Sequence, residues 1–416
     1  MRAQDLRKLD ADLTEFVDDL IADVGRVDRR ASLRSYVTGL LLDGERKSME
    51  PMARRLVSRE DEVDAMRQRL QECVTTSPWS EDDLYARLAR KIEAELPGVE
   101  ALILDDTGFP KKGTHSVGVE RQYSGTLGRV DNCQVGTSLH LACERGSCCI
   151  AMDLYLPTKW AENPDRRRKA GVPDDVLFRT KWQIGLDQID AARRAGVRHH
   201  VVLADAGFGD VKEFREGLAD RQLRYVVGIQ SVVRVWAPGT TPVAPVEPAA
   251  KTKGRPRKKF RTGDDKPVTV VDFAASFGPG ALKTLTWRVG SRGPQRSRFG
   301  AIRVRTAQGH SRGKAPGDEV WLMWAWPDDE EKPAKFWLSN LPATTSLKRL
   351  VYLAKLRWRV ERDYQEMKGE VGLDHYEGRT WRGWHHHTAL VAIAHAFLTL
   401  QRVLSPPILH EEMDAA

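Results

Sequence analysis

The sequence predicts a mixed α/β protein with an all-helical N-terminal region and a β-rich insertion between its last core strand and a long helix. Apolar residues recur at helical spacing through residues 1–97, and strand-like runs alternate with helical ones through 98–230. Short β runs follow in 231–340, after a stretch rich in Pro, Thr, Lys and Arg. Helices in 341–403 complete the core, and 404–416 form a tail.

Composition and charge narrow the class of protein. A chain of 416 residues and 46.9 kDa with 41% hydrophobic and 30% charged residues has enough apolar material for two or three domains. The net charge of +8 and the pI near 9.2 permit a polyanionic partner without requiring one. Positive charge is concentrated between Lys251 and Arg261, where seven of eleven residues are basic.

Several features predict a cytoplasmic, nucleoid-associated protein. The charged N-terminal residues argue against a signal peptide, and we find no apolar run of the roughly eighteen residues that a membrane span needs. The five cysteines form no CxxC pair, so we expect reduced, mostly buried thiols.

The N-terminal region should fold as a series of short helices. Helices are expected over Ser48–Leu56 and Asp61–Val74, and Ser80 with Asp83 resembles a helix start. Scattered arginines suit a DNA-reading module, but a helical scaffold or a dimerisation unit explains the same pattern equally well.

The core should alternate strands and helices. One apolar run ends in Asp105 and Asp106, and two further strands flank a turn at Gly146. A short buried strand stops at Asp205. The helices expected here are Asp174–Ala195 and Asp210–Ala219.

The stretch Arg357–Arg379 reads as one long helix with two stripes. Arg357, Glu361 and Lys368 recur at offsets of four and seven, beside an apolar stripe. A surface helix with salt bridges is the ordinary explanation of such a pattern. The apolar stripe consists of Leu353, Leu356, Val360, Tyr364, Met367 and Val371.

Three acids share a position that favours chemistry. Asp106 and Asp205 end buried strands, and Glu361 lies on a helix expected to pack on the sheet. Carboxylates without nearby Cys or His clusters favour Mg²⁺ or Mn²⁺ over Zn²⁺. Two such ions about 4 Å apart activate an attacking oxygen and stabilise a leaving one in phosphodiester chemistry.

These residues resemble the acidic triad of DDE transposases, insertion-sequence enzymes with an RNase H-like catalytic fold. Asp106 stands in DDTG, Asp205 in LADAGFGD and Glu361 in RWRVERDYQEMK. Arg357, Glu361 and Lys368 also fit the Tyr-Arg-Glu-Lys signature of the hairpin-forming group, with Ala354 at the tyrosine position. The runs DDTGFPKKGTHSVGVERQYSGTLGRVDNCQVG and YQEMKGEVGLDHYEGRTWRGWHHH are similar to a bacterial insertion-sequence subgroup.

The resemblance implies a DNA transposase that cuts the ends of its element and joins them to target DNA with two Mg²⁺ or Mn²⁺ ions. It implies terminal inverted repeats and target DNA as partners, a homodimer on DNA, and phosphate contacts by Arg357 and Lys368. One alternative is an RNase H-like host nuclease without strand transfer. A DNA-binding regulator that has lost catalysis is another.

Other basic residues are candidates for DNA contact. Lys111 and Lys112 follow the first acid closely enough to reach a scissile phosphate, or they form a solvated turn. A basic cluster resembles the core of an AT-hook, which binds the minor groove. It contains Lys253, Arg255, Arg257, Lys258 and Lys259.

Two further acidic or metal-like features have ordinary explanations. Asp210 could lie behind the site, but a helix cap is the simpler interpretation. His385, His386 and His387 are consecutive, and neighbouring helical residues diverge by about 100°, so they cannot converge on one ion.

Overall fold

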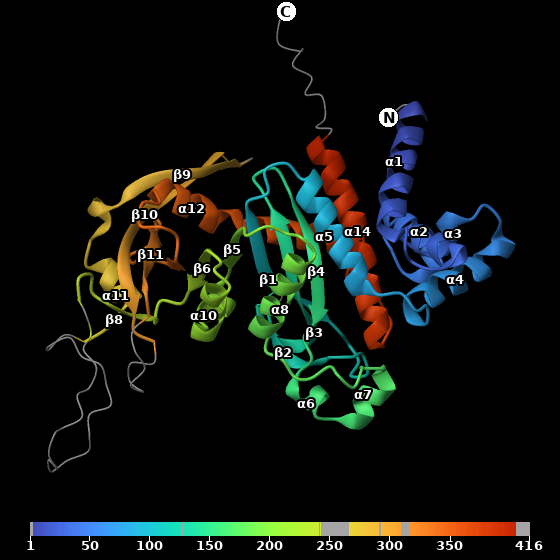
Figure 1. The fold of residues 1–416 in the computed structure, drawn as a ribbon, viewed down its shortest axis with the longest axis horizontal. Helices are drawn as coiled ribbons and strands as arrows, with labels where there is room; N and C mark the ends of the chain where they lie inside the picture. Colours follow the sequence, from blue (N-terminus) through green and yellow to red (C-terminus); the bar gives the residue numbers. More distant parts are fainter. Residues whose placement is uncertain are drawn as a thin grey trace, which may run out of the picture. The chain divides into compact units, whose positions relative to one another are not determined.

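The computed structural model describes residues 3–125, 128–240, 242, 266–290, 293–308 and 317–404. The chain forms two compact units, each described here by itself. The first comprises residues 1–198 and 358–416, and the second comprises 199–357. Figure 1 shows the course of the chain through both. The α/β class, with helices at the N-terminus and many strands in the second half, is confirmed.

The first unit contains an antiparallel sheet organised around one long strand, β3. β1 pairs with β3 from Cys133 to Ala142, while β2 and β4 pair with successive parts of β3. The β3–β4 hairpin turns at Gly146, as expected from sequence, where Cys143 N–H donates to the Gly146 carbonyl at 2.9 Å. The strands are β1 Ala101–Pro110, β2 Glu120–Ser124, β3 Arg129–Ala142 and β4 Ser147–Leu154.

Helices cover this sheet, and α14 (Trp381–Leu404) is central to their packing. It contacts β4 and the N-terminal helices, and Figure 1 shows α5 and α14 side by side along β4. The Ser80 hydroxyl accepts from Asp83 N–H at 3.1 Å, which confirms the expected start of α5. The N-terminal helices are α1 Ala3–Ile21, α2 Val27–Leu41, α3 Met49–Leu56, α4 Val63–Thr75 and α5 Glu81–Glu95.

α14 is a core helix despite its apolar character. Among the described residues it alone is long and apolar enough to cross a membrane, so the expectation that no segment reaches this length was wrong. However, 78% of its most apolar window is buried inside the protein. All five cysteines are buried thiols, as predicted.

Three shorter helices of the first unit lie between β4 and the second unit in sequence. They are α6 Thr158–Ala161, α7 Pro164–Ala170 and α8 Lys181–Arg194. α8 starts seven residues later than the expected Asp174, because Thr180 and Gln183 form a capping box that fixes its first turn.

The second unit contains a mixed sheet. β5 and β6 are parallel, and the order continues β6, β12, β11, β10, β7, β8 through antiparallel pairs, with β9 also on β10. Its strands are β5 Val201–Ala204, β6 Tyr225–Ile229, β7 Arg234–Trp236, β8 Val268–Thr269, β9 Lys283–Gly290, β10 Gly293–Thr306, β11 Glu319–Trp326 and β12 Lys335–Ser339. Its helices are α9 Ala206–Gly209, α10 Lys212–Asp220, α11 Val270–Ala275 and α12 Leu347–Leu356.

The single long helix expected over Arg357–Arg379 is not present. α12 ends at Leu356, and a separate helix, α13 (Trp358–Gly369), follows Arg357. Residues after Gly369 are irregular until Trp381. The six residues of the apolar stripe are nevertheless all buried, although Val371 lies beyond the end of α13.

Candidate active site

Asp205 follows β5 directly, as its position after an apolar run predicted, and it also caps the short helix α9. Its Oδ1 accepts from the backbone N–H groups of Gly207 at 2.9 Å and Phe208 at 3.4 Å. These two bonds fix the carboxylate orientation, because they use donors that a helix N-terminus leaves open. Both fall on Oδ1, so Oδ2 is the oxygen available to a cation.

The turn that holds Asp205 lies against β6 at unusually short range. A Cβ added at Gly209 would meet the Gly228 carbonyl oxygen at 1.9 Å. Gly228 also lies close to the backbone of Asp205. A Cβ added at Gly228 would lie 3.5 Å from the Asp205 Cα. Because neither glycine has a side chain, the turn from Asp205 to Gly209 can pack directly against the backbone of β6, and this packing positions Asp205.

Asp106 lies inside β1 rather than at its end, which corrects the sequence-based expectation. The strand continues to Pro110 because the residues after Asp106 pair in register with β3, from Thr107 opposite Gly136 to Pro110 opposite Cys133. Asp105 is 9% exposed, while Asp106 is the more accessible of the two acids. This difference fits the alternation of side chains along a strand.

A lysine that the sequence analysis did not single out contacts Asp106. Lys181 donates from Nζ to Asp106 Oδ2 at 2.8 Å. Lys181 is the first residue of α8, where the capping box at Thr180 sets its position. The capping box of Thr180 and Gln183 marks the start of α8, and this sequence signal could have drawn attention to Lys181.

Glu361 lies in the first turn of α13 and is exposed. The helix packs against β1 and β4 of the same unit. Val360, Tyr364 and Met367 bury one side of it, which leaves the Glu361 side at the surface. A carboxylate in a first turn is also favoured by the helix dipole.

A buried polar network that sequence reasoning missed anchors α13. The Asp363 carboxylate contacts His140 Nδ1 at 2.7 Å and accepts from Ser147 Oγ at 2.7 Å. Ser138 Oγ bonds both His140 Nε2, at 2.9 Å, and the Tyr364 hydroxyl, at 2.6 Å. Such a fully connected network fixes the rotation of the helix, and with it the direction of Glu361.

A second anchor of α13 is Glu366. Its carboxylate accepts from Arg362 at 2.5 Å and from Arg402 Nη1 at 2.8 Å, and it contacts His395 at 3.3 Å. Burial alone would raise the pKa of Glu366, but hydrogen bonds from Arg402, His395 and Arg362 lower it well below its usual range.

The predicted phosphate-binding cations occupy different environments. Lys368 donates to the Gly108 carbonyl at 2.8 Å, and Lys111 donates to that of Tyr376 at 3.0 Å. Lys111 is half-buried, and burial lowers the pKa of both lysines. Lys112 is exposed, and Arg357 caps the C-terminus of α12. The basic cluster Lys253, Arg255, Arg257, Lys258 and Lys259 lies outside the described residues.

Two expectations about other polar residues were tested by their contacts. The Asp210 carboxylate does not cap the helix that follows it, because Val211 is the N-cap of α10 and Asp210 Oδ1 accepts from Gln230 N–H, just after β6, at 2.8 Å. The three histidines diverge as predicted. His385 bonds the carbonyl of Trp381, His386 that of Trp79 and His387 that of Gly372.

The candidate acids are divided between the units. Asp106 and Glu361 belong to the first unit and Asp205 to the second. Within the described ranges, no cluster of three or more His, Cys, Asp or Glu side chains is close enough to hold a metal ion. The donor chemistry itself fits a hard divalent cation, because all three side chains offer carboxylate oxygens.

Two-metal sites act on phosphodiester bonds in nucleases, polymerases and phosphatases. A family model for the DDE superfamily endonucleases matches residues 19–294, so the chain belongs to that family. The matched range includes Asp106 and Asp205 and ends before Glu361.

A curated relative points to a narrower class. The chain is 29% identical over 195 residues to a protein from Microchaete diplosiphon named "Probable transposase for insertion sequence element IS701". The alignment covers 46% of this chain and 47% of that protein, so the chain spans about half the length of its relative.

Proposed function

We propose that the chain is the transposase of a bacterial insertion sequence, acting in the cytoplasm on the nucleoid. Membership in the DDE endonucleases and the partial likeness to a probable transposase support this function. The observation that carries it is the setting of Asp205, which is locked by two backbone N–H groups through one oxygen only.

Asp106, Asp205 and Glu361 are the proposed ligands of two divalent ions, Mg²⁺ or Mn²⁺. When bound, such ions supply the positive charge that activates the attacking oxygen and stabilises the leaving one. The residues of the chain orient the carboxylates and hold the DNA. Lys181 balances the charge of Asp106 before a cation arrives, because its ammonium lies on Oδ2.

The proposed reaction has two parts. In cleavage, water attacks a phosphorus at the end of the element and the 3′-oxygen leaves with a proton. In joining, that 3′-hydroxyl attacks a target phosphorus, and the target's own 3′-oxygen leaves. Each part forms one phosphorus–oxygen bond and breaks one, so no cofactor beyond the metal is required.

Basic side chains would hold the phosphates. We propose this role for Arg357, Lys368, Lys111 and Lys112, and for the basic cluster of the β-rich insertion. Affinity that rests on such contacts falls steeply as salt rises, because bound cations are released from the DNA.

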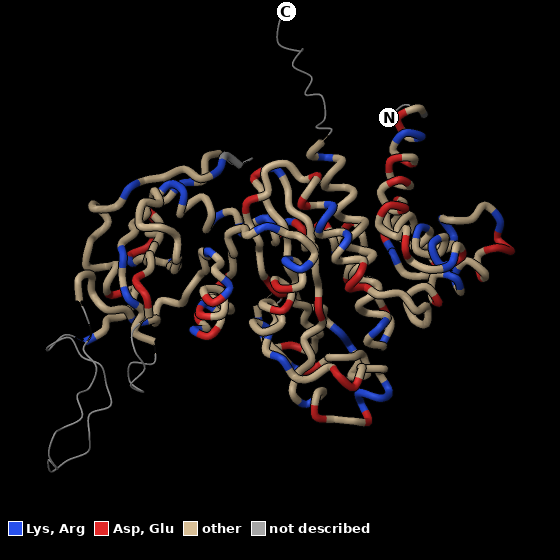
Figure 2. Tube along the Cα trace, in the orientation of Figure 1, with Lys and Arg blue, Asp and Glu red and all other residues tan. Residues whose placement is uncertain are grey.

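We also propose that residues 1–97 bind DNA and that residues 98–230 and 341–403 form the catalytic core. Figure 2 shows both signs of charge along the N-terminal helices. Several arginines there are paired within the chain, including Arg34 with Asp18 and Arg54 with Glu50 at 3.0 Å. A DNA-binding surface in this region would therefore use basic side chains other than these paired arginines. A dimer on DNA would bring two element ends together.

The test combines the protein with DNA carrying the element ends, target DNA and Mg²⁺. Cleaved ends joined to the target support the proposal. Cleavage without joining would instead indicate a nuclease, and tight binding without metal-dependent cutting would indicate a regulator. Released flanking DNA with open ends would exclude a hairpin step, which Ala354 at the tyrosine position already disfavours.

A further inference from the structure

A buried arginine on α10, Arg215, contacts the segment that carries Asp205. The side chain is 5% exposed. Its Nη1 donates to the carbonyl of Gly209, and its Nη2 donates to the side-chain oxygen of Gln308, just after β10. Both acceptors are uncharged, so the guanidinium is buried on neutral partners.

This placement is unfavourable for the arginine itself. Burial lowers the pKa of Arg215, while Tyr225, Asp210, Glu216 and Glu213 partly offset the effect. Removing a cation from water costs free energy that two hydrogen bonds to neutral acceptors do not fully return. The position is better explained by what the guanidinium holds in place than by its own contribution to stability.

What Arg215 holds is the turn from Asp205 to Asp210. Gly209 N–H donates to the Asp205 carbonyl at 2.8 Å, so the carbonyl that Arg215 binds belongs to the same turn. Gln308 Nε2 donates to the Asp210 carbonyl at 2.6 Å. Arg215 and Gln308 therefore bind consecutive carbonyls of the turn and also each other.

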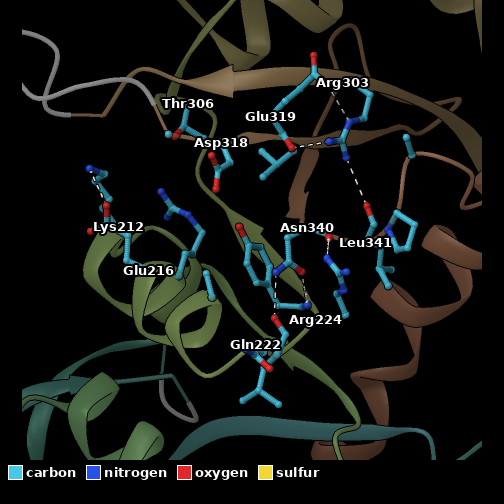
Figure 3. Close-up of a pocket in the computed structure, with 18 residues that line it drawn as sticks. Lys212, Glu216, Gln222, Arg224, Arg303, Thr306, Asp318, Glu319, Asn340 and Leu341 are labelled. Carbon is cyan, nitrogen blue, oxygen red and sulfur yellow. Dashed lines mark hydrogen bonds and ion pairs between the residues drawn. The ribbon is translucent and has the colours of Figure 1, made fainter.

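The arginine can be reached from solvent through a cavity of about 480 Å³ within the second unit. Lys212, Arg215, Tyr225 and Arg303 are among its lining residues. Figure 3 shows Arg303 on the far wall of the cavity from Lys212 and Glu216. Arg303 donates to the Leu341 carbonyl at 3.3 Å and pairs with Glu319 at 3.6 Å. It is thus an arginine of the same cavity with no bond to the Asp205 turn.

We propose that Arg215 is a positioning residue for Asp205, and that Gln308 extends this support to the β-rich insertion. Its role in catalysis rests on the proposed function of Asp205 as a metal ligand. The support acts on the backbone of the turn, so Arg215 itself contacts neither metal nor DNA.

The test compares Arg215→Gln with the control Arg303→Gln by amide hydrogen exchange of the whole protein without metal. We expect exchange at residues 207–210 to accelerate about tenfold in Arg215→Gln only, as loss of a hydrogen bond from a charged donor predicts. In the same variant, the Mn²⁺ concentration that half-saturates binding should rise. Unchanged exchange at 207–210 in a folded Arg215→Gln protein would overturn the proposal.

Two further variants test the proposal by the same exchange measurement. If Arg215→Gln does not fold, Gln308→Ala removes one bond to Arg215 and one to Asp210, and it should accelerate exchange at the same amides. Methylguanidinium added to Arg215→Ala should restore protection through the cavity, and failure at saturating concentration would count against the proposal. Exchange is measured without DNA, so a wild-type protein that cuts no DNA would refute the proposed function and leave this inference standing.

Discussion

The ammonium of Lys181 lies 2.8 Å from Oδ2 of Asp106, so the first candidate acid is neutralised by a cation of its own chain. A divalent ion that binds Asp106 must compete with this lysine. The pairing is part-buried, with 31% of the Lys181 side chain and 22% of the Asp106 side chain exposed, and it is therefore only partly screened by solvent.

Replacing Lys181 should ease metal binding. In Lys181→Gln, the competing charge is absent, so the Mg²⁺ or Mn²⁺ concentration for half-saturation should fall several-fold. Calorimetric titration of the DNA-free protein measures this directly. Lys159→Gln is the matched control, since Lys159 pairs with Glu120 at 3.3 Å and leaves Asp106 untouched. A higher metal requirement in Lys181→Gln would mean that the lysine assists binding instead of competing.

Gly209→Ala should displace the Asp205 turn. Its Cβ would lie 1.9 Å from a backbone oxygen of β6, which cannot rotate away. We expect a loss of about 1–3 kcal/mol in the free energy of unfolding and a larger relative loss of DNA cutting. Gly280→Ala is the control, because an added Cβ there meets no atom within 4 Å. Equal activity of the two variants would show that Asp205 does not depend on this contact.

Asp363→Ala should destabilise the first unit strongly. Removing one partner from a buried, hydrogen-bonded pair costs about 3–5 kcal/mol, and His140 and Ser147 would both lose their acceptor. Glu361→Ala, on the exposed side of the same helix, should change the free energy of unfolding by less than about 1 kcal/mol. Urea unfolding of both variants gives the comparison. A small effect of Asp363→Ala would remove the network as the anchor of α13.

Acid should destabilise the protein through His387. Burial lowers the pKa of this imidazole to about 4, from 6.5. Below pH 6.5 the unfolded chain binds a proton that the folded chain does not, so stability is lost as the pH falls from 6.5 toward 4. Between pH 7 and pH 5 the loss is roughly 2 kcal/mol.

His387→Gln offers a matched variant for that prediction. The Tyr36 hydroxyl lies 2.9 Å from His387 Nδ1, and Nε2 lies 3.2 Å from the Gly372 carbonyl. A glutamine can accept from the first and donate to the second, but it does not titrate. Unfolding midpoints at pH 5 and pH 7 should differ less in this variant than in the wild type. An identical difference would assign the acid sensitivity to other groups.

Local patterns in the sequence predicted much of the fold. The buried strand before Asp205, the hairpin at Gly146 and the cap at Ser80 depend on neighbouring residues, and all three were predicted correctly. The extension of β1 beyond Asp106 depends on pairing with β3, which is distant in sequence. The break at Arg357 was missed because apolar residues continue at helical spacing from α12 into α13.

The surroundings of the candidate acids were harder to predict than the acids. Asp106, Asp205 and Glu361 stood out because they lie in recognisable motifs. Lys181 and the partners of Asp363 come from segments far away in the chain. Lys181 reaches Asp106 from α8, and His140 and Ser147 reach Asp363 from β3 and β4. Arg215 was hidden in an ordinary amphipathic helix, where a buried cation leaves no pattern in a single sequence.

The central claim is that Asp106, Asp205 and Glu361 cut DNA together with a divalent metal. The most direct measurement is the Mg²⁺-dependent cleavage rate of DNA carrying the element ends, for the wild type and Glu361→Ala, beside their DNA affinities. Loss of metal positioning should lower cleavage by several orders of magnitude. Affinity should change little, because it rests on many basic contacts. A Glu361→Ala protein that cuts at the wild-type rate would contradict the account.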